Sequence, residues 1–280
     1  MYRVENNKII IEKLNNFNIV HILECGQIFR YKKVENDYIV FSKSEKAIVK
    51  TYRDKVEITC TNVDYFIKFF DLETNYTNIK QKLGQFDELK PILDICYGVR
   101  ILKQWDYEMI ISFIISSNNN IKRIQMIIEN ICKKFGKNMG EYFAFPTLKE
   151  LENASIEDFK LCGAGYRAKY LVNVIKQLKD FNYNEIYSLS SEKAIDKILS
   201  LSGVGPKVAD CILLFGFNKN DVFPVDTWIK KVYNSYFTKE KTDNVKEIRK
   251  NLVKMFGDLS GYAQQYLFYY KRSFEKYILN

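Results

Sequence analysis

The spacing of apolar residues divides the chain into a strand-rich first part and a helical remainder. Residues 56–60 alternate between apolar and polar side chains, and short β-rich runs occupy 38–41 and 47–52. Alternation with a period of two is typical of a half-buried strand. We therefore expect an antiparallel sheet over residues 7–61.

From residue 62 onward apolar residues recur every three or four positions, as along 121–131, 229–236 and 245–255. This period predicts amphipathic helices. We expect an α+β fold in which a mainly antiparallel β domain at 1–90 packs on an all-α bundle at 91–280.

Several residues are expected to mark the helix ends. Gly136 and Gly257 each follow a predicted helix, which is typical of C-terminal caps. Ser155 with Asp158, and Ser191 before an apolar run, are expected to be N-terminal caps.

Charge and cysteine usage narrow the classes of partner. The 280 residues carry a net charge of +9, which favours a polyanionic partner, although a Lys-rich composition can have other origins. Six cysteines occur without a C-x-x-C pair and His21 is the one histidine, so we expect no zinc site or iron-sulfur cluster. No apolar run approaches the roughly 18 residues of a membrane span. We expect a cytoplasmic protein with reduced thiols and no membrane partner.

The sequence Leu-Ser-Gly-Val-Gly-Pro-Lys-Val-Ala-Asp predicts a helix-hairpin-helix unit over 192–217. Gly203 and Gly205 can adopt positive φ and, with Val204 between them, let a phosphate approach the backbone, while Pro206 suits the first position of a helix. Amide groups and the helix dipole favour an anion at this turn. Such a hairpin binds phosphate without reading base sequence. The alternative is a glycine-rich turn between two packed helices.

Lys207 is the candidate nucleophile of this unit. It lies one residue inside the second helix, where the dipole and partial burial are expected to lower its pKa. A neutral amine could attack C1′ of a sugar, expel the base and leave a Schiff base. A lysine that only contacts a phosphate is the alternative.

Asp226, in Phe-Pro-Val-Asp-Thr-Trp, precedes another amphipathic helix and is expected to cap it. A carboxylate held by helix amides can also stabilise positive charge that develops on a deoxyribose. Capping alone is the simpler explanation, and both roles can hold together. Lys207 and Asp226 are therefore the predicted catalytic pair, provided that the fold brings them into one cleft.

The hairpin and the downstream Pro-Val-Asp resemble the signature of the helix-hairpin-helix DNA glycosylases, and a lysine at position 207 resembles their lyase-competent members. Further motifs, from Cys25 to Arg272, resemble the 8-oxoguanine DNA glycosylase family. These motifs are Cys25 to Arg30, Tyr97 to Arg100, Phe113 to Asn120, Gly163 to Arg167, Lys207 to Cys211 and Gly261 to Gln264. The resemblance implies a bifunctional glycosylase and abasic-site lyase that acts on 8-oxoguanine in double-stranded DNA, in base excision repair. We expect it to act as a monomer.

The resemblance also assigns roles around an extruded base. It implies that Asn118 fills the vacated space, that Tyr166 wedges the neighbouring stack, and that Arg123 and Arg167 hydrogen-bond the orphaned cytosine. Filling the space would offset the cost of unstacking the base. For the Ser-Ser-Asn-Asn-Asn stretch, a polar helix-capping turn is the alternative.

The predicted pocket for the lesion base consists, by the same resemblance, of Gly26, Cys211, Gln264 and Phe268. N7 of guanine is an acceptor, whereas oxidation at C8 leaves N7 protonated, so a carbonyl at Gly26 would accept from the lesion and repel guanine. Gln264 and Phe268, four residues apart, would read the base edge and stack on the ring, and Cys211 would cover the opposite face. Core packing is the alternative for Phe268 and Cys211.

The chain departs from the family pattern at Trp228, where many relatives have a histidine that meets a phosphate; the contact there must differ or be lost. The C-terminal cysteine cluster of endonuclease III is absent from the sequence, which argues against that branch. The resemblance implies no organic cofactor. It allows a monovalent cation at the hairpin carbonyls, which no side chain here proves.

Three other functions stay open at this point. A glycosylase of the same fold could act on an alkylated purine or an oxidised pyrimidine, although Gly26, Gln264 and Phe268 count against it. A non-catalytic DNA-binding module could use the hairpin alone, but Asp226 would then have no role beyond capping. A basic helical scaffold would leave Asn118 and Tyr166 without a shared purpose.

Overall fold

The computed structural model describes residues 2–274, and its first part is a six-stranded antiparallel sheet with strand order β1-β2-β6-β5-β4-β3. The strands are β1 Tyr2–Glu5, β2 Lys8–Ile11, β3 Tyr31–Val34, β4 Asp37–Ser42, β5 Glu45–Thr51 and β6 Val56–Cys60. The predicted antiparallel sheet is confirmed, although its first strand begins before the expected start. The helix α1 (Ile19–Leu23) interrupts it, with its amides capped by Asn18.

The inner face of the sheet is built from one row of buried residues across the strands. Ile9 pairs with Ile58, Ile58 with Val49, and Val49 with Tyr38. All four are almost fully buried and pack with Phe66 of α2 (Val63–Phe69) in one apolar cluster. The period-two pattern therefore places its apolar side chains on the face that the helix covers.

The rest of the described chain is mainly helical, as predicted. The longer helices are α3 Tyr76–Leu83, α5 Asp106–Ser116, α6 Ile121–Phe135, α9 Arg167–Leu178, α11 Ser191–Leu199, α12 Pro206–Phe217, α14 Val245–Phe256 and α15 Ser260–Ser273. The shorter ones are α4 Lys90–Ile95, α7 Leu148–Leu151, α8 Ile156–Leu161, α10 Tyr183–Ser188 and α13 Thr227–Val232, together with 3-10 turns at Leu14–Asn16 and Gly257–Leu259 and a π-helix at Tyr233–Phe237. The α+β fold class is confirmed.

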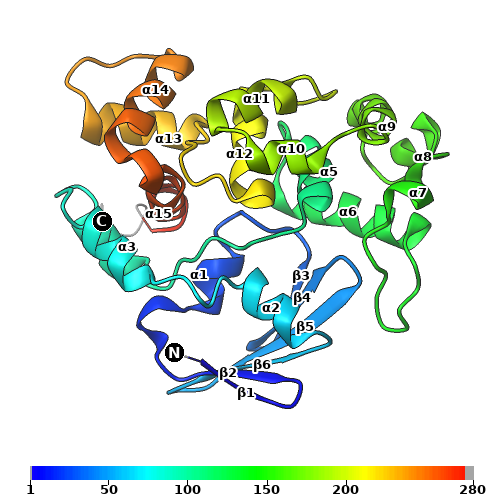
Figure 1. The fold of residues 1–280 in the computed structure, drawn as a ribbon, viewed down its shortest axis with the longest axis horizontal. Coiled ribbons are helices and arrows are strands. Elements are labelled where there is room, and N and C mark those ends of the chain that lie inside the picture. The colour runs from blue at the N-terminus through cyan, green and yellow to red at the C-terminus, as the bar shows by residue number, and fades with distance from the viewer. Residues whose placement is uncertain (1, 275–280) are drawn as a thin grey trace.

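Figure 1 shows the sheet at one end of the molecule, with the helices gathered on one side of it. The C-terminal helix α15 lies beside the N-terminal segment, since the Gln265 amide donates to the carbonyl of Cys25 (3.1 Å) and the Tyr266 hydroxyl to that of Val99 (3.3 Å). The segment that carries Gly26 is therefore held against α15.

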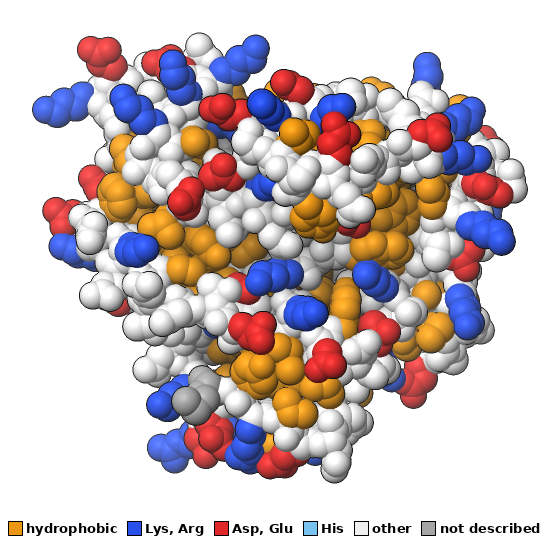
Figure 2. All heavy atoms as spheres, viewed as in Figure 1, with side chains coloured by type: hydrophobic (Ala, Val, Ile, Leu, Met, Phe, Trp, Pro, Cys, Tyr) orange, Lys and Arg blue, Asp and Glu red, His pale blue; other side chains and the backbone are white. Residues whose placement is uncertain are grey.

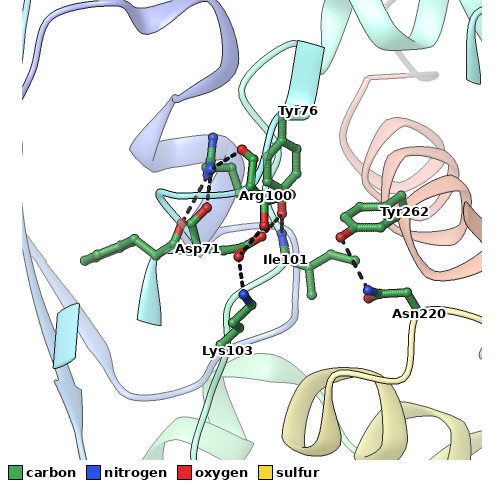
Figure 3. Close-up of polar contacts among 9 residues, drawn as sticks. Asp71, Tyr76, Arg100, Ile101, Lys103, Asn220 and Tyr262 are labelled. Atoms are coloured by element: carbon green, nitrogen blue, oxygen red, sulfur yellow. Dashed lines mark hydrogen bonds and ion pairs between the residues drawn. The ribbon is translucent and has the colours of Figure 1, made fainter. Parts of the chain in front are cut away.

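A buried arginine holds the segment that leads from the sheet region to the helices (Figure 3). The Arg100 guanidinium donates to the carbonyls of Phe70 (3.1 Å), Asn16 (2.9 Å) and Asp71, and it stacks on the ring of Tyr76 at 4.0 Å. The Asp71 carboxylate accepts from the Tyr76 hydroxyl (3.0 Å). Each of the three guanidinium nitrogens thereby donates to the protein itself.

The predicted caps are confirmed with one exception. Ser155 and Asp158 form a reciprocal capping box, and Gly136 and Gly257 follow α6 and α14. Ser191, however, is the first residue of α11 rather than its cap, which is Ser190. The Ser191 hydroxyl instead donates to the carboxylate of Asp221, which is a tertiary contact rather than a cap.

Basic side chains do not form one continuous patch on the face seen in Figure 2, where lysine and arginine alternate with acidic groups around apolar areas. No helix within residues 2–274 is long and apolar enough to cross a membrane. On this face the basic side chains are therefore interspersed with acidic ones.

Candidate active site

The predicted helix-hairpin-helix unit is formed by α11, a tight turn and α12. Its two glycines differ in backbone conformation and in surroundings. Gly203 has a φ of +82°, and a Cβ added there would lie 2.7 Å from the Cβ of Tyr170. Gly205 has a φ of −103°, so it does not use the positive φ that glycine allows. A Cβ at Gly205 would meet nothing within 4 Å. Gly203 therefore makes the turn, and Gly205 leaves the backbone open at the helix N-terminus, where Pro206 is the first residue.

Asp226 caps α13 as predicted. One carboxylate oxygen, Oδ1, accepts hydrogen bonds from the amides of Trp228 (3.0 Å) and Ile229 (2.9 Å). No hydrogen bond to the second oxygen is found within the described part of the chain. That oxygen can therefore face a ligand while the helix holds the group in place.

Lys207 and Asp226 line the same two adjoining cavities. The first, of about 530 Å³, we call the α15 cavity, and the second, of about 560 Å³, the hairpin cavity. Trp228 lines both as well. The α15 cavity is also lined by Gly26, Phe29, Phe113, Ser116, Asn119, Asn120, Ile121, Lys122, Ile124, Phe268 and Arg272, and the hairpin cavity by Ser116, Ser117, Asn118, Asn119, Gly205, Pro206, Val208, Val225 and Thr227. The predicted catalytic pair therefore shares one cleft.

The environment of Lys207 raises its pKa, so the predicted lowering is wrong. Burial of the ammonium lowers the pKa, but the Cys211 sulfur and the Asp226 carboxylate act the other way, and together they outweigh it. Burial in turn raises the pKa of Cys211 to about 11. The Lys207 nitrogen therefore lies in a buried site that it shares with the Cys211 sulfur and the Asp226 carboxylate. The Lys207 amine must lose a proton before it can act as a nucleophile.

The predicted base-pocket residues divide between the lining of the α15 cavity and buried positions outside that lining. Gly26 has a φ of +87°, and a Cβ there would lie 3.2 Å from Cε1 of Phe268 and 2.8 Å from Nη1 of Arg272. Gln264 is buried, and its Oε1 has no hydrogen-bond partner within residues 2–274. Cys211 is also buried, hydrogen-bonded to the Lys207 side chain. Gly26 and Phe268 line the cavity, whereas Gln264 and Cys211 lie outside the lining in the free protein.

The predicted wedge residues also come together, around Asn118, which lines the hairpin cavity. Asn118 is exposed at a φ of +48°, and the exposed Tyr166 ring lies 4.4 Å below the Arg167 guanidinium. Arg167 is buried and donates to the carbonyls of Ser117 (2.9 Å) and Asn118 (2.7 Å). In this state it supports the Asn118 turn rather than presenting its guanidinium outward.

Arg123 is the exposed cation of this group. It lies on α6, and its Nη2 would be 3.9 Å from a Cβ at Gly165, beside Tyr166. Of the two arginines predicted to meet a cytosine, Arg123 is therefore the one whose side chain faces solvent.

Sequence reasoning missed Arg272, whose guanidinium lies over the Phe268 ring at 5.2 Å in the α15 cavity. It also gave Trp228 no place in the cleft. The signal for Arg272 was present, because it follows Gln264 and Phe268 at the same four-residue spacing and so falls on the same helix face.

Comparisons with known proteins give matches over both parts of the chain. The model of the HhH-GPD superfamily of base excision DNA repair proteins matches residues 111–257, and that of the 8-oxoguanine DNA glycosylase N-terminal domain matches residues 9–110. A probable N-glycosylase/DNA lyase of Methanothermobacter thermautotrophicus is 32% identical over 80% of this chain and 76% of its own. The N-glycosylase/DNA lyase of Saccharomyces cerevisiae is 29% identical over 89% of this chain and 82% of its own.

A solved structure is similar over nearly the whole length. The Clostridium acetobutylicum 8-oxoguanine glycosylase/lyase, in complex with double-stranded DNA containing cytosine opposite 8-oxoguanine, matches with a TM-score of 0.91 and 38% identity. The match covers 97% of this chain and 97% of that one.

Proposed function

This chain belongs to the HhH-GPD superfamily of base excision DNA repair proteins, in its 8-oxoguanine DNA glycosylase family, and from that premise we propose how its cleft works. It is a DNA glycosylase with abasic-site lyase activity. Its substrate is 8-oxoguanine in duplex DNA, preferably opposite cytosine, and its nucleophile is Lys207. The observation that carries the proposal is that Lys207 and Asp226 line one cavity with Gly26 and Phe268.

The chemistry begins with the Lys207 ammonium beside the Asp226 carboxylate. The amine forms a bond to C1′ while the C1′–N9 bond breaks, and the electron pair of that bond leaves with the base. Lys207 loses a proton and the departing base gains one, so protons balance across the step. Asp226 stabilises the positive charge that develops on the sugar. The C1′–O4′ bond then breaks while a proton moves from the Lys207 nitrogen to O4′, which gives the Schiff base. Loss of a C2′ proton from this intermediate expels the 3′ phosphate.

Selection of the lesion rests on two acceptors, one at the cavity wall and one buried outside its lining. The Gly26 carbonyl would accept the N7 proton that 8-oxoguanine carries and guanine lacks. Gln264 has a buried Oε1 without a partner, which suits the N–H groups on the Watson–Crick edge of a guanine derivative. An unsatisfied buried acceptor is costly, so the base that satisfies it is favoured.

Recognition of the opposite strand would rely on the cluster around Tyr166. The exposed ring can wedge a base stack, Asn118 can enter the vacated space, and Arg123 is free to reach a cytosine. Arg167 can contribute only by sharing or leaving its carbonyl partners. Action as a monomer and a monovalent cation at the hairpin carbonyls remain predictions.

The first prediction tests the nucleophile. Borohydride should trap the protein covalently on duplex DNA that contains 8-oxoguanine opposite cytosine, because a Schiff base is reducible. Lys207→Gln should abolish trapping and excision while duplex binding, measured by fluorescence anisotropy, is retained. A variant that still excises the base would contradict the assignment of Lys207.

A panel of lesions and opposing bases tests the substrate. Release of 8-oxoguanine should exceed release of alkylated purines and oxidised pyrimidines, and cytosine should be the best opposing base. Preferential release of a different lesion would favour another member of the same fold class over this proposal.

A further inference from the structure

Three residues of α15 form one row along the cleft. Gln264, Phe268 and Arg272 are spaced four residues apart, so they share a helix face and lie about 6 Å from one another along the axis. Phe268 and Arg272 line the α15 cavity, and Gln264 is the buried residue one turn before them. An 8-oxoguanine base has its Watson–Crick edge at one end, its ring in the middle and its C8 oxygen at the other end. The row presents an amide, a ring and a guanidinium in matching order.

The Arg272 guanidinium is fixed from two sides. Nη2 donates to the carbonyl of Glu24, and the plane lies over the ring of Phe268 at 5.2 Å from its centroid. Such a group loses little freedom when a ligand arrives, since its rotamer is already set. Arg272 is therefore preorganised at the cavity wall.

A second nitrogen of this guanidinium is unsatisfied. Nη1 is buried and has no hydrogen-bond partner in the described part of the chain, and it lies 2.8 Å from the position of a Cβ at Gly26. A buried N–H donor without an acceptor is rare and costly. A ligand that supplies an acceptor beside Gly26 would remove that cost.

We propose that Arg272 Nη1 donates a hydrogen bond to the exocyclic C8 oxygen of the extruded lesion and so reads the oxidation directly. The inference rests on the proposed function, because it takes the lesion to be held with N7 at the Gly26 carbonyl and the Watson–Crick edge toward Gln264. In that pose the C8 oxygen flanks N7 on the side away from Gln264, which is where Arg272 lies.

Guanine can form neither this hydrogen bond nor the one to the Gly26 carbonyl. It presents a C8–H group to Nη1 and an N7 lone pair to the carbonyl, so a donor and an acceptor stay unsatisfied together. The lesion would use both groups at this position, because its N7 proton needs the Gly26 carbonyl and its C8 oxygen needs the guanidinium. Arg272 is thus a specificity-determining residue, distinct from the Lys207 and Asp226 pair.

The test compares Arg272→Met, which keeps an unbranched side chain over Phe268 but has no donor, with the unaltered protein. A matched control is Lys271→Met, which removes the same charge from the neighbouring position of α15, outside the lining of the α15 cavity in residues 2–274. Arg272→Lys, which keeps the charge, is a second variant should the first fail to fold. Single-turnover excision is measured on duplexes with 8-oxoguanine or 8-thioxoguanine, which keeps the N7 proton but places sulfur, a weak acceptor, at C8.

Cleavage of a preformed abasic site supplies the reference rate. Arg272→Met should lower the ratio of 8-oxoguanine excision to abasic-site cleavage by about 10- to 100-fold, the range for a hydrogen bond from a charged group. In the unaltered protein, 8-thioxoguanine should be excised more slowly than 8-oxoguanine. This difference in excision rate should be smaller in Arg272→Met and unchanged in Lys271→Met. Arg272→Lys should keep part of the preference for oxygen.

An unchanged excision ratio in Arg272→Met would overturn the proposal. The proposal would also be overturned if Arg272→Met showed the same difference in excision rate between 8-oxoguanine and 8-thioxoguanine as the unaltered protein. That result would place the contact on another atom of the base. If the unaltered protein excises neither base yet cleaves abasic sites, the proposed substrate fails instead, and the two failures are distinguished.

Discussion

His21 shows how far a single residue here depends on its surroundings. Its ring contacts those of Tyr97 (5.1 Å) and Tyr269 (5.4 Å), and its Nδ1 accepts from the amide of Gly98 (3.4 Å). These contacts join α1 to α15. Both helices lie beside the loop that carries Gly26. Burial lowers the pKa of His21 to about 4, against a partial rise from the hydrogen bond to Cys96.

The one histidine gives a prediction that NMR can read without assignment. Its ring proton should titrate with a midpoint near 4 in the folded protein, whereas in urea it should titrate near the ordinary value of about 6.5. The unfolded chain takes up this proton first, so His21 should lower stability as the pH falls from about 6.5 towards 4 and contribute nothing above that window. A folded-state midpoint above 6 would contradict the burial of this ring.

In the hairpin between α11 and α12, one glycine forms the turn and the other leaves the backbone accessible. Gly203 is required for the backbone path and for close packing on Tyr170, while Gly205 stands in open space. The Ser202 amide is satisfied by the Gln177 side chain (2.8 Å), which ties the turn to α9. The hairpin that would hold a phosphate is thus fixed by α9, the helix that also carries Arg167.

Alanine at each glycine should separate folding from binding. Gly203→Ala should lower the free energy of unfolding by at least about 1–2 kcal/mol, from the positive φ alone, and weaken DNA binding. Gly205→Ala should leave stability the same or slightly higher, because its φ suits alanine, while it crowds an approaching phosphate. Urea unfolding and DNA titrations measure the two effects. Equal stability losses would show that the turn does not need positive φ at Gly203.

At the scale of the whole molecule, a buried ion pair joins the sheet to the helices. Arg30 follows the Gly26 loop and lies 3.5 Å from Glu108 of α5, while it also donates to the carbonyl of Phe143 (2.7 Å). Glu108 accepts from the amide of Lys43 (3.0 Å), at the turn between β4 and β5. Burial raises the pKa of Glu108, and Arg30 opposes that rise. The pair therefore fixes how the Gly26 side of the cleft sits against α5.

Removing one charge of this pair should be costly. Glu108→Gln leaves the Arg30 cation buried without compensation, and an arginine cannot escape by losing its proton. We expect the free energy of unfolding at pH 7 to fall by roughly 3–5 kcal/mol. Glu157→Gln, which breaks an exposed pair with Lys160, is the matched control and should change it little. Similar losses in both variants would mean that the buried pair does not hold the junction.

Much of the fold and part of the site could be predicted from the sequence. The strands around Val56, the helical remainder, the Ser155 capping box and the Asp226 cap all follow from local rules that relate neighbouring residues. The hairpin could be recognised for the same reason, since glycine and proline constrain the backbone wherever they stand. The error at Ser191 arose where a tertiary partner replaced the expected local role.

The sequence alone therefore determined the elements, the hairpin and the family, because periodicity and turn chemistry act over a few residues. Only the tertiary structure decided which distant residues share a cleft, as Gly26, Lys207 and Arg272 do. It also decided the direction of the Lys207 pKa, since burial and the charge of Asp226 are properties of the assembled site. Local patterns cannot supply these facts, because the energies involved depend on contacts between segments far apart along the chain.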